Sequence, residues 1–211
     1  MVLVTPEFWE RPEGRKLSAV LPSEPSQIAP ELLDGLTDSD SPRGALALIQ
    51  LPRGGPETLP RAADGLYLYI DRLQDPGNLG ALARTAEAFN ATGLALAPGT
   101  VDPNHPRALR ASAGSLLRLP VAVGTERQDL DRHLDASPPH WIALVPRGGE
   151  SLDRATLRRP VVLAVGAEGP GLADELVAHA DLRLTIPVAA PVESLNATVA
   201  AALVLYALRR R

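Results

Sequence analysis

The feature that most constrains the fold is a regular alternation of short apolar runs with stretches of helical periodicity after residue 64. Such alternation is typical of a parallel β-sheet with helices on both of its faces. We therefore predict an α/β domain over 64–211. The predicted strands lie at 66–70, 93–97, 120–123, 141–145, 161–165 and 182–186, and the predicted helices at 79–90, 106–112, 127–134, 172–179 and 195–209.

Residues 1–51 form a second region with weaker periodicity. Strand-like pieces lie at 17–21 and 45–50, and a helix is predicted at 30–36. So few apolar periods predict a thin core, so we expect 1–51 to be poorly ordered or to lean on the larger domain. The Pro- and Gly-rich stretch 52–63 has the composition of a linker.

Composition excludes several classes of function. The 211 residues contain no apolar run long enough for a membrane-spanning helix and begin with no signal-peptide pattern. The absence of Cys excludes disulfides, thiolate metal ligands and Cys nucleophiles, and it fits a cytoplasmic protein. The four His residues have no metal-ligand spacing, so no metal site is predicted.

The net charge of −4 gives no overall signal for nucleic-acid binding, but the local charge pattern does. No Asp or Glu occurs from 103 to 125, whereas Arg107, Arg110 and Arg118 all lie there. This basic island is the best candidate for a phosphate-contacting face. A solvated helix face explains any one of these arginines equally well.

Three loops follow apolar runs, and the first is Asp75-Pro-Gly-Asn78. Asn78 stands where a helix N-cap would, so capping alone is one interpretation of this residue. Arg84 falls inside the helix that follows. Its structural alternative is an ion pair with Glu87, which would contribute only tenths of a kcal/mol.

The second loop is Gly166-Ala-Glu168-Gly169-Pro-Gly171. Glycines after a buried strand allow positive φ and let the backbone approach a ligand closely. Their spacing is a poor match to the dinucleotide-binding pattern, which disfavours an oxidoreductase. A plain strand-to-helix turn is the alternative.

The third loop runs from Ile186 to Asn196 and contains Pro187 and Pro191. Ser194 can cap the final helix. Asn196 would then lie in the first helical turn, where Asn is an indifferent choice unless its side chain is engaged elsewhere.

In this order and spacing, the three loops resemble the motifs of the SpoU (TrmH-like) branch of the SPOUT RNA methyltransferases. The resemblance covers about 64–211 and implies a parallel sheet whose segment at about 161–211 forms a deep trefoil knot. It further implies that the chain transfers a methyl group from S-adenosylmethionine to a ribose 2′-hydroxyl of RNA, as a homodimer. Val188 and Ala190 depart from the family's usual Met and Gly.

The resemblance assigns the site residues as well. It implies that Arg84, Asn78, Ser194 and Asn196 serve catalysis, and that the basic island binds RNA. Because an Arg side chain keeps its proton in proteins, we expect Arg84 to stabilise developing charge rather than to act as an ordinary base. The residues expected to hold S-adenosylmethionine are Gly166, Glu168, Gly169, Ile186, Leu195 and Asn196.

The segment 1–51 resembles the latter part of the small α/β substrate-binding domain that precedes the catalytic domain in many SpoU enzymes. The phrase Leu36-Thr-Asp-Ser-Asp-Ser-Pro-Arg-Gly44 carries this likeness. The first half of that domain is expected to be missing. The partial domain favours ribosomal RNA as the substrate, with transfer RNA or an inactive RNA-binding relative as alternatives.

Overall fold

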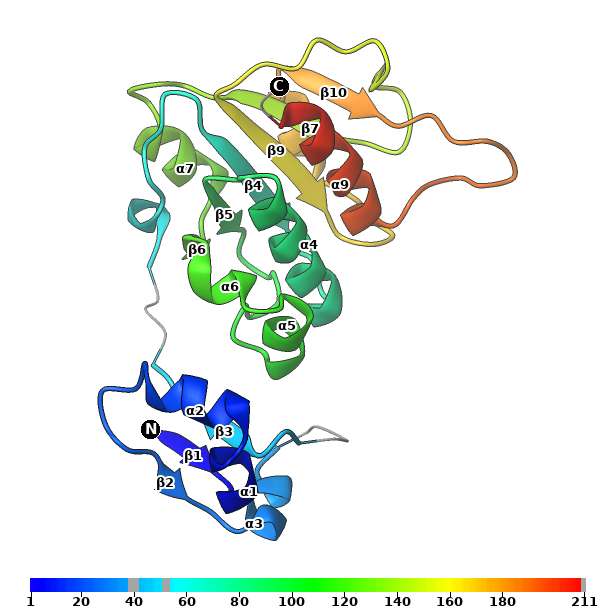
Figure 1. Ribbon diagram of the computed structural model, residues 1–211. Helices are drawn as coiled ribbons and strands as arrows, with labels where there is room; N and C mark the ends of the chain where they lie inside the picture. The colour runs from blue at the N-terminus through cyan, green and yellow to red at the C-terminus, as the bar shows by residue number, and fades with distance from the viewer. Residues whose placement is uncertain (38–41, 51–53, 210–211) are drawn as a thin grey trace. The chain divides into compact units, whose positions relative to one another are not determined.

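The computed structural model describes residues 1–37, 42–50 and 54–209, in two compact units, Met1–Pro52 and Arg53–Arg211 (Figure 1). Part of the expected turn at 36–44, residues 51–53 at the start of the expected linker, and the final two arginines lie outside the described residues. Each unit has its own sheet.

The first unit is a small mixed sheet with three short helices. β1 pairs in parallel with β2 and antiparallel with β3, which gives the strand order β2-β1-β3. Val4 and Leu33 are the hydrophobic residues buried among the described part of this unit, so the thin core is confirmed. The elements are β1 (Val2–Val4), α1 (Pro6–Trp9), α2 (Pro12–Ser18), β2 (Ser26–Gln27), α3 (Pro30–Gly35) and β3 (Ala45–Ala47).

The strand predicted at 17–21 is wrong, because its first residues complete α2. Pro12 opens this helix at a position where its missing N–H is not needed, and Glu13 lies in the first turn. Arg15 and Lys16 lie in the last turn, where positive charge is favoured. These terminal signals outweigh the apolar letters of 17–21.

The second unit contains a seven-stranded, fully parallel sheet in the order β6-β5-β4-β9-β7-β10-β8. The central strands β4 and β9 are buried along their whole length. The expected parallel α/β domain is therefore confirmed, whereas the knot at about 161–211 stays a prediction. The strands are β4 (Leu66–Asp71), β5 (Gly93–Leu96), β6 (Val121–Val123), β7 (His140–Leu144), β8 (Glu150–Ser151), β9 (Val161–Gly166) and β10 (Leu182–Thr185).

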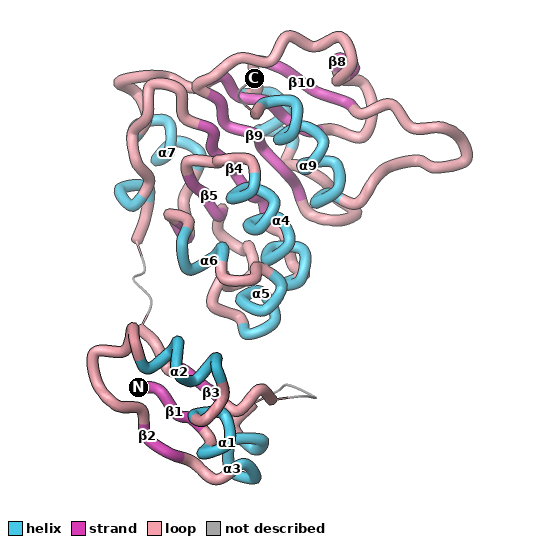
Figure 2. The backbone as a smooth tube through the Cα atoms, in the orientation of Figure 1, coloured by secondary structure: helices cyan, strands magenta, loops and turns pink. Residues whose placement is uncertain are grey.

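Helices cover both faces of this sheet, as predicted. Leu66, Leu68 and Ile70 of β4 face a core with α4, α5, α6 and α9, and Tyr67 and Tyr69 face the opposite core with α7 and α8. α4 and α9 lie side by side on the first face (Figure 2). The helices are α4 (Pro76–Ala88), α5 (Pro106–Ala111), α6 (Ser115–Arg118), α7 (Arg127–His133), α8 (Asp174–His179) and α9 (Ala197–Leu208).

The described part of the Pro- and Gly-rich stretch, 54–63, packs on the second unit. A 3₁₀ turn, Pro56–Thr58, leads to Leu59, which is buried in the same core as Tyr67. The Tyr67 hydroxyl donates to the carbonyl of Pro60 at 2.6 Å and accepts from the amide of Ala62 at 3.1 Å. Linker-like composition thus coexists here with fixed contacts, because Pro and Gly are equally common in tight turns.

No helix in the described residues is long and apolar enough to cross a membrane.

Close packing of α4 on α5 depends on Gly80. A Cβ atom at this position would lie 2.3 Å from the carbonyl oxygen of Ala108 and 2.7 Å from the Cβ of Ala111. We expect Gly80→Val to lower the free energy of unfolding by about 1–3 kcal/mol, because overpacking forces the two helices apart. Urea denaturation measures the change.

Ala88→Val is the matched control, since Ala88 is exposed on the same helix. It should lower stability only by about 0.5 kcal/mol, the difference in helix propensity. Equal losses in the two variants would contradict the tight contact at Gly80.

Candidate functional site

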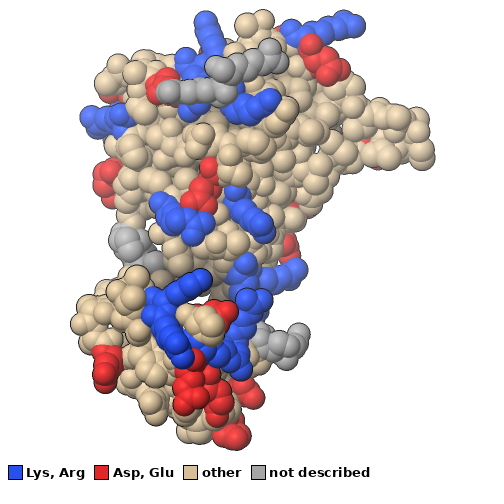
Figure 3. All heavy atoms as spheres, viewed as in Figure 1, with Lys and Arg blue, Asp and Glu red and all other residues tan. Residues whose placement is uncertain are grey.

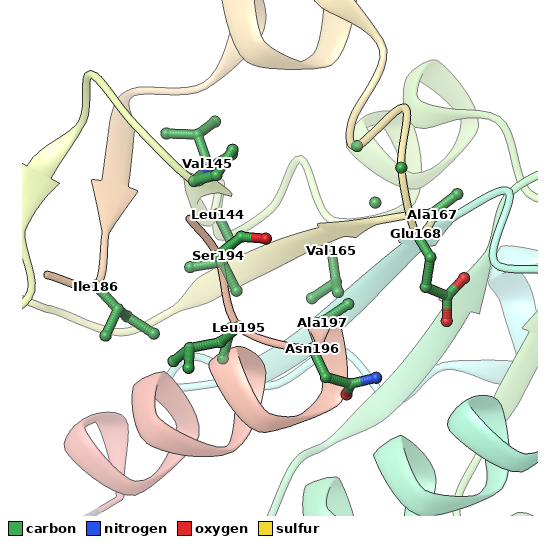
Figure 4. A pocket seen from close by; sticks show the side chains of 15 residues that line it. Leu144, Val145, Val165, Ala167, Glu168, Ile186, Ser194, Leu195, Asn196 and Ala197 are labelled. Carbon is green, nitrogen blue, oxygen red and sulfur yellow. The ribbon is translucent and has the colours of Figure 1, made fainter. Parts of the chain in front are cut away.

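A cavity of about 340 Å³ opens where strands β7, β9 and β10 end. In Figure 4, Ile186 and Leu195 lie on one side of this cavity and Glu168 lies on the other. Its apolar walls and backbone-lined edge suit a ligand that has both an apolar and a polar part. The lining residues are Leu144, Val145, Pro146, Val165, Gly166, Ala167, Glu168, Gly169, Gly171, Ile186, Ser194, Leu195, Asn196, Ala197 and Ala200.

The glycine loop after β9 closes on itself. The amide of Gly171 donates to the carbonyl of Ala167 at 3.0 Å. A Cβ atom on Gly166 would lie 2.2 Å from the carbonyl carbon of Gly171, so no side chain fits there. Gly169 and Gly171 have φ values of +86° and +72°, in the left-handed region that favours glycine. The loop therefore presents backbone to the cavity.

Asn78 does not cap α4, which corrects one interpretation of the sequence. The N-cap is Asp75, whose Oδ1 accepts the backbone N–H of Asn78 at 2.7 Å. Capping at Asp75 starts the helix at Pro76, three residues before its predicted first residue. The side chain of Asn78 is thereby free to donate from its Nδ2 to the Glu168 carboxylate.

Asn196 is the N-cap of α9, a role that the sequence pattern assigned to Ser194. Its Oδ1 accepts the backbone N–H groups of Thr198 and Val199 at 2.9 and 3.3 Å. Its Nδ2 donates to the Oδ1 of Asn78 at 3.4 Å. Ser194 is instead an exposed residue on the cavity wall.

A chain of polar contacts therefore joins the three loops in the order Asn196, Asn78, Glu168. The helix cap fixes its direction, because the oxygen of Asn196 faces the α9 amides and its nitrogen must face Asn78. The nitrogen of Asn78 then faces Glu168. Residues 118 positions apart in sequence are held in one network.

Arg84 lies exposed on α4, outside the lining of the cavity. The interpretation that pairs it with Glu87 is wrong, because Glu87 accepts hydrogen bonds from Arg118 Nε at 2.6 Å and from the Ser115 hydroxyl at 2.6 Å. No hydrogen bond or ion pair holds Arg84 within the described part of the chain. Its guanidinium is available to an outside partner.

The basic island of 103–125 is partly neutralised by acidic residues outside it. Arg118 pairs with Glu87 at 2.6 Å, and Arg107 lies 3.4 Å from Asp75. Arg110 also has a partner. Basic and acidic side chains are interspersed on the face of the second unit in Figure 3. The gap in acidic residues along the sequence therefore does not translate into an unpaired patch in space.

The structure adds one wall of the cavity that the sequence reasoning missed. β7 lies between β9 and β10, so the second and third loops do not follow adjacent strands. Leu144, Val145 and Pro146 at the end of β7 fill the space between them. The signal was present, since the predicted strand at 141–145 runs into a Pro-Arg-Gly-Gly turn like the other loops.

No group of three or more potential metal-ligating side chains occurs within the described ranges 1–37, 42–50 and 54–209.

Comparisons with known proteins agree with this geometry. The family model described as the SpoU rRNA Methylase family matches residues 65–206. An uncharacterized tRNA/rRNA methyltransferase of Synechocystis is 35% identical over 184 residues, which cover 87% of this chain and 66% of that protein. The 23S rRNA (uridine(2479)-2′-O)-methyltransferase of Streptomyces viridochromogenes is 31% identical, covering 94% of this chain and 71% of that protein.

Among solved structures, the SpoU methyltransferase AviRb from Streptomyces viridochromogenes in complex with AdoMet superimposes with a TM-score of 0.87 at 27% identity. The match covers 99% of this chain and 81% of that one. The present chain thus spans about two thirds of the first curated relative and more of the solved one.

The Glu87–Arg118 contact predicts a specific pH response. Hydrogen bonds from Arg118 and then Ser115 lower the pKa of Glu87 to about 2 from an ordinary value of 4.5. A lowered folded-state pKa stabilises the fold above the ordinary value, and this stabilisation is lost as the pH falls from 4.5 towards 2. Arg118→Ala should raise the pKa of Glu87 towards its ordinary value and flatten the dependence of Tm on pH in this window.

NMR titration of the Glu87 carboxyl measures the first effect and thermal melts measure the second. Arg107→Ala is the control, because Arg107 pairs with Asp75 and should leave the Glu87 titration unchanged. An unchanged pKa of Glu87 in Arg118→Ala would contradict the assignment.

Proposed function

Because the chain belongs to the SpoU rRNA methylase family, we propose that it is an RNA 2′-O-ribose methyltransferase that uses S-adenosylmethionine and acts on ribosomal RNA. The observation that carries the proposal is the network of Asn196, Asn78 and Glu168 beside the cavity. Three loops that are far apart in sequence supply one side chain each, which a structural cap or turn alone does not require. Ribosomal RNA is favoured because the Streptomyces relative is named for it.

The cavity fits the donor by shape and by chemistry. A volume of about 340 Å³ lies in the range of small-molecule sites. Ile186, Leu195 and Val145 offer apolar surface to a flat base, and the backbone of Gly166 and Gly169 offers polar groups at the rim. Glu168 and Asn196 also line the cavity. When bound, S-adenosylmethionine supplies an electrophilic methyl group.

The residues of the chain would then bind and orient the RNA. Arg84, exposed and unpaired among the described residues, would contact the reacting ribose or its phosphate and stabilise the negative charge that develops on the 2′-oxygen. Asn78 and Asn196, held by each other, would fix the direction of that contact. Ser194 would orient the substrate at the mouth of the cavity. Positioning of the hydroxyl for in-line transfer supplies much of the rate enhancement.

Arginines of the basic island would contact phosphates of the RNA backbone that lie away from the reacting ribose. Arg107 has a 63% exposed side chain and a loose 3.4 Å ion pair with Asp75, so it can exchange partners with a phosphate. Arg110 would contact the RNA too, because it is exposed and lies in the same stretch without acidic residues. Arg118 would contribute least, since it is committed to Glu87.

A second copy of the chain would cover the outer surface of α9. Val199, Leu203 and Tyr206 lie along this helix and are 43–53% exposed. Exposure of these apolar side chains to water is unfavourable, so a homodimer through α9 is part of the proposal. Residues 1–51 would form the substrate-binding unit, 52–63 its connection and 64–211 the catalytic domain. A Cys-free RNA enzyme fits the cytoplasm.

Arg84→Ala tests the proposed reaction. We expect methylation of ribosomal RNA to fall by at least about 100-fold, because a charge-stabilising contact in the transition state is lost. The affinity for S-adenosylmethionine should stay within about twofold of wild type, since Arg84 does not line the cavity. Incorporation of labelled methyl groups into ribosomal RNA and into transfer RNA measures the first, and calorimetry measures the second.

Arg84→Lys is the matched variant, because it keeps the charge and removes the planar fork. We expect it to restore little activity. Full activity of Arg84→Ala would rule out the assignment, and methylation of transfer RNA alone would overturn the choice of ribosomal RNA.

Gly169→Val tests the donor site. Gly169 lines the cavity with a φ of +86°, so a Val side chain both strains the loop and obstructs the ligand. We expect the affinity for S-adenosylmethionine to fall by at least about tenfold. Gly124→Val is the control, because Gly124 has a φ of +62° and open space around it but does not line the cavity.

Both variants should lose similar stability, and only Gly169→Val should lose donor affinity. Unchanged affinity in a folded Gly169→Val variant would count against this cavity as the donor site.

A further inference from the structure

Asp71 is the one charged residue among the buried residues that the structure describes, at 5% exposure. It is the last residue of β4, and its register partner is Gly166, the last residue of β9. It does not line the cavity. A buried carboxylate is costly unless it is paired and hydrogen-bonded, so its partners indicate why it is there.

Two kinds of partner satisfy the Asp71 carboxylate. Arg72 donates from Nε to Oδ1 and from its terminal NH₂ to Oδ2, both at 3.0 Å. Arg72 has a φ of 55°, which is uncommon for a residue with a side chain. The backbone N–H of Ala173 donates to Oδ2 at 3.0 Å.

The contact with Ala173 fixes the far end of the glycine loop. The loop leaves the sheet at Gly166, closes by the Gly171 to Ala167 hydrogen bond, and reaches Ala173 just before α8. Gly169 and Gly171 allow many backbone conformations, so the loop needs anchors at both ends to keep one of them. Strand pairing anchors Gly166, and the Asp71 carboxylate anchors Ala173.

We propose that Asp71 is a positioning residue for the methyl donor, which acts by holding the 166–173 loop through the Ala173 N–H in its binding conformation. This inference rests on the proposed function for the identity of the donor. The anchoring itself does not, because it concerns the loop alone. The two hydrogen bonds from Arg72 hold the carboxylate in the orientation that faces Ala173.

A pair of single variants and their combination test the proposal. Asp71→Ala removes the carboxylate, so the contacts to Arg72 and to Ala173 are all lost. Ala173→Pro removes the N–H at a φ of −61°, which Pro adopts readily, and places the ring Cδ against the Asp71 carboxylate, which must move away. Each variant should weaken binding of S-adenosylmethionine by about 10- to 100-fold, the range for losing a hydrogen bond to a charged group.

The double variant should be no weaker than the weaker single one, because both remove the same bond. The KM for S-adenosylmethionine should rise in each, while kcat at saturating donor and the KM for RNA stay near wild type. A purely structural role would lower thermal stability without this split between KM and kcat.

Asp131→Ala is the matched control. Asp131 is a partly buried carboxylate that accepts from Trp141 Nε1 at 2.9 Å, and it does not line the cavity. We expect Asp131→Ala to lower thermal stability and leave donor affinity unchanged. Wild-type donor affinity in folded Asp71→Ala or Ala173→Pro, or additive losses in the double variant, would overturn the proposal.

Hydrogen exchange without ligand separates this inference from the proposed function. In the wild type, the amide of Ala173 should be protected, and in Asp71→Ala the amides of Gly171 and Ala173 should exchange faster. Fast exchange of Ala173 in the wild type overturns the anchoring whether or not Asp71→Ala folds. A wild-type protein that binds no S-adenosylmethionine overturns the proposed donor instead, and the exchange result then decides the anchoring alone.

Discussion

The pairing of β4 with β9 is the constraint on which the rest of the second unit depends. Six consecutive residue pairs run in parallel register from Leu66 with Val161 to Asp71 with Gly166. Because parallel strands end at the same edge, the loop that enters α4 and the glycine loop must leave the sheet together. The contact between Asn78 and Glu168 depends on that register, because a shift by one residue would turn the side chains of one strand to the opposite face of the sheet.

Three carboxylates of the second unit already have hydrogen-bond or ion-pair partners. Glu87 is occupied by Arg118 and Ser115, Asp75 caps α4 and meets Arg107, and Asp71 is occupied by Arg72. Each of these three carboxylates is thus paired with an arginine. Arg84 is exposed and has no partner among the described residues, which is what a contact with an anionic polymer requires.

Much of the second unit could be predicted from sequence, because short apolar runs and helical periods report burial directly. The central strands were predicted to within one residue at each end, and both covered faces were expected. The residue types of the three motifs also pointed to one cavity, and Gly166, Glu168, Ser194 and Asn196 do line it. What pattern reasoning could not give was the strand order, which placed β7 between β9 and β10.

The N-caps of α4 and α9 were also predicted wrongly, because they too depend on the arrangement of the elements in space. Asp75 and Asn78 are both good capping residues for α4, and Ser194 and Asn196 are both good capping residues for α9. Only the position of each helix in space decides which of the two caps it. Glu87 shows the same dependence on tertiary structure, because its partner is Arg118, 31 residues away, rather than the neighbouring Arg84. Sequence spacing favours partners that are close along the chain, whereas tertiary packing determines which residues are actually in contact.

The double engagement of Asn196 narrows what that position tolerates. As a helix cap, it could be replaced by Asp, Ser or Thr, each of which offers an oxygen to the α9 amides. As a donor to Asn78, it also needs a hydrogen on a second atom of the side chain, which Asp lacks and which the single hydroxyl oxygen of Ser or Thr does not provide. Gln carries the right groups on a stem one carbon longer. Asn offers the acceptor and the donor on two atoms at the distance that both partners require, so sequence variation at 196 should be smaller than the capping role alone would allow.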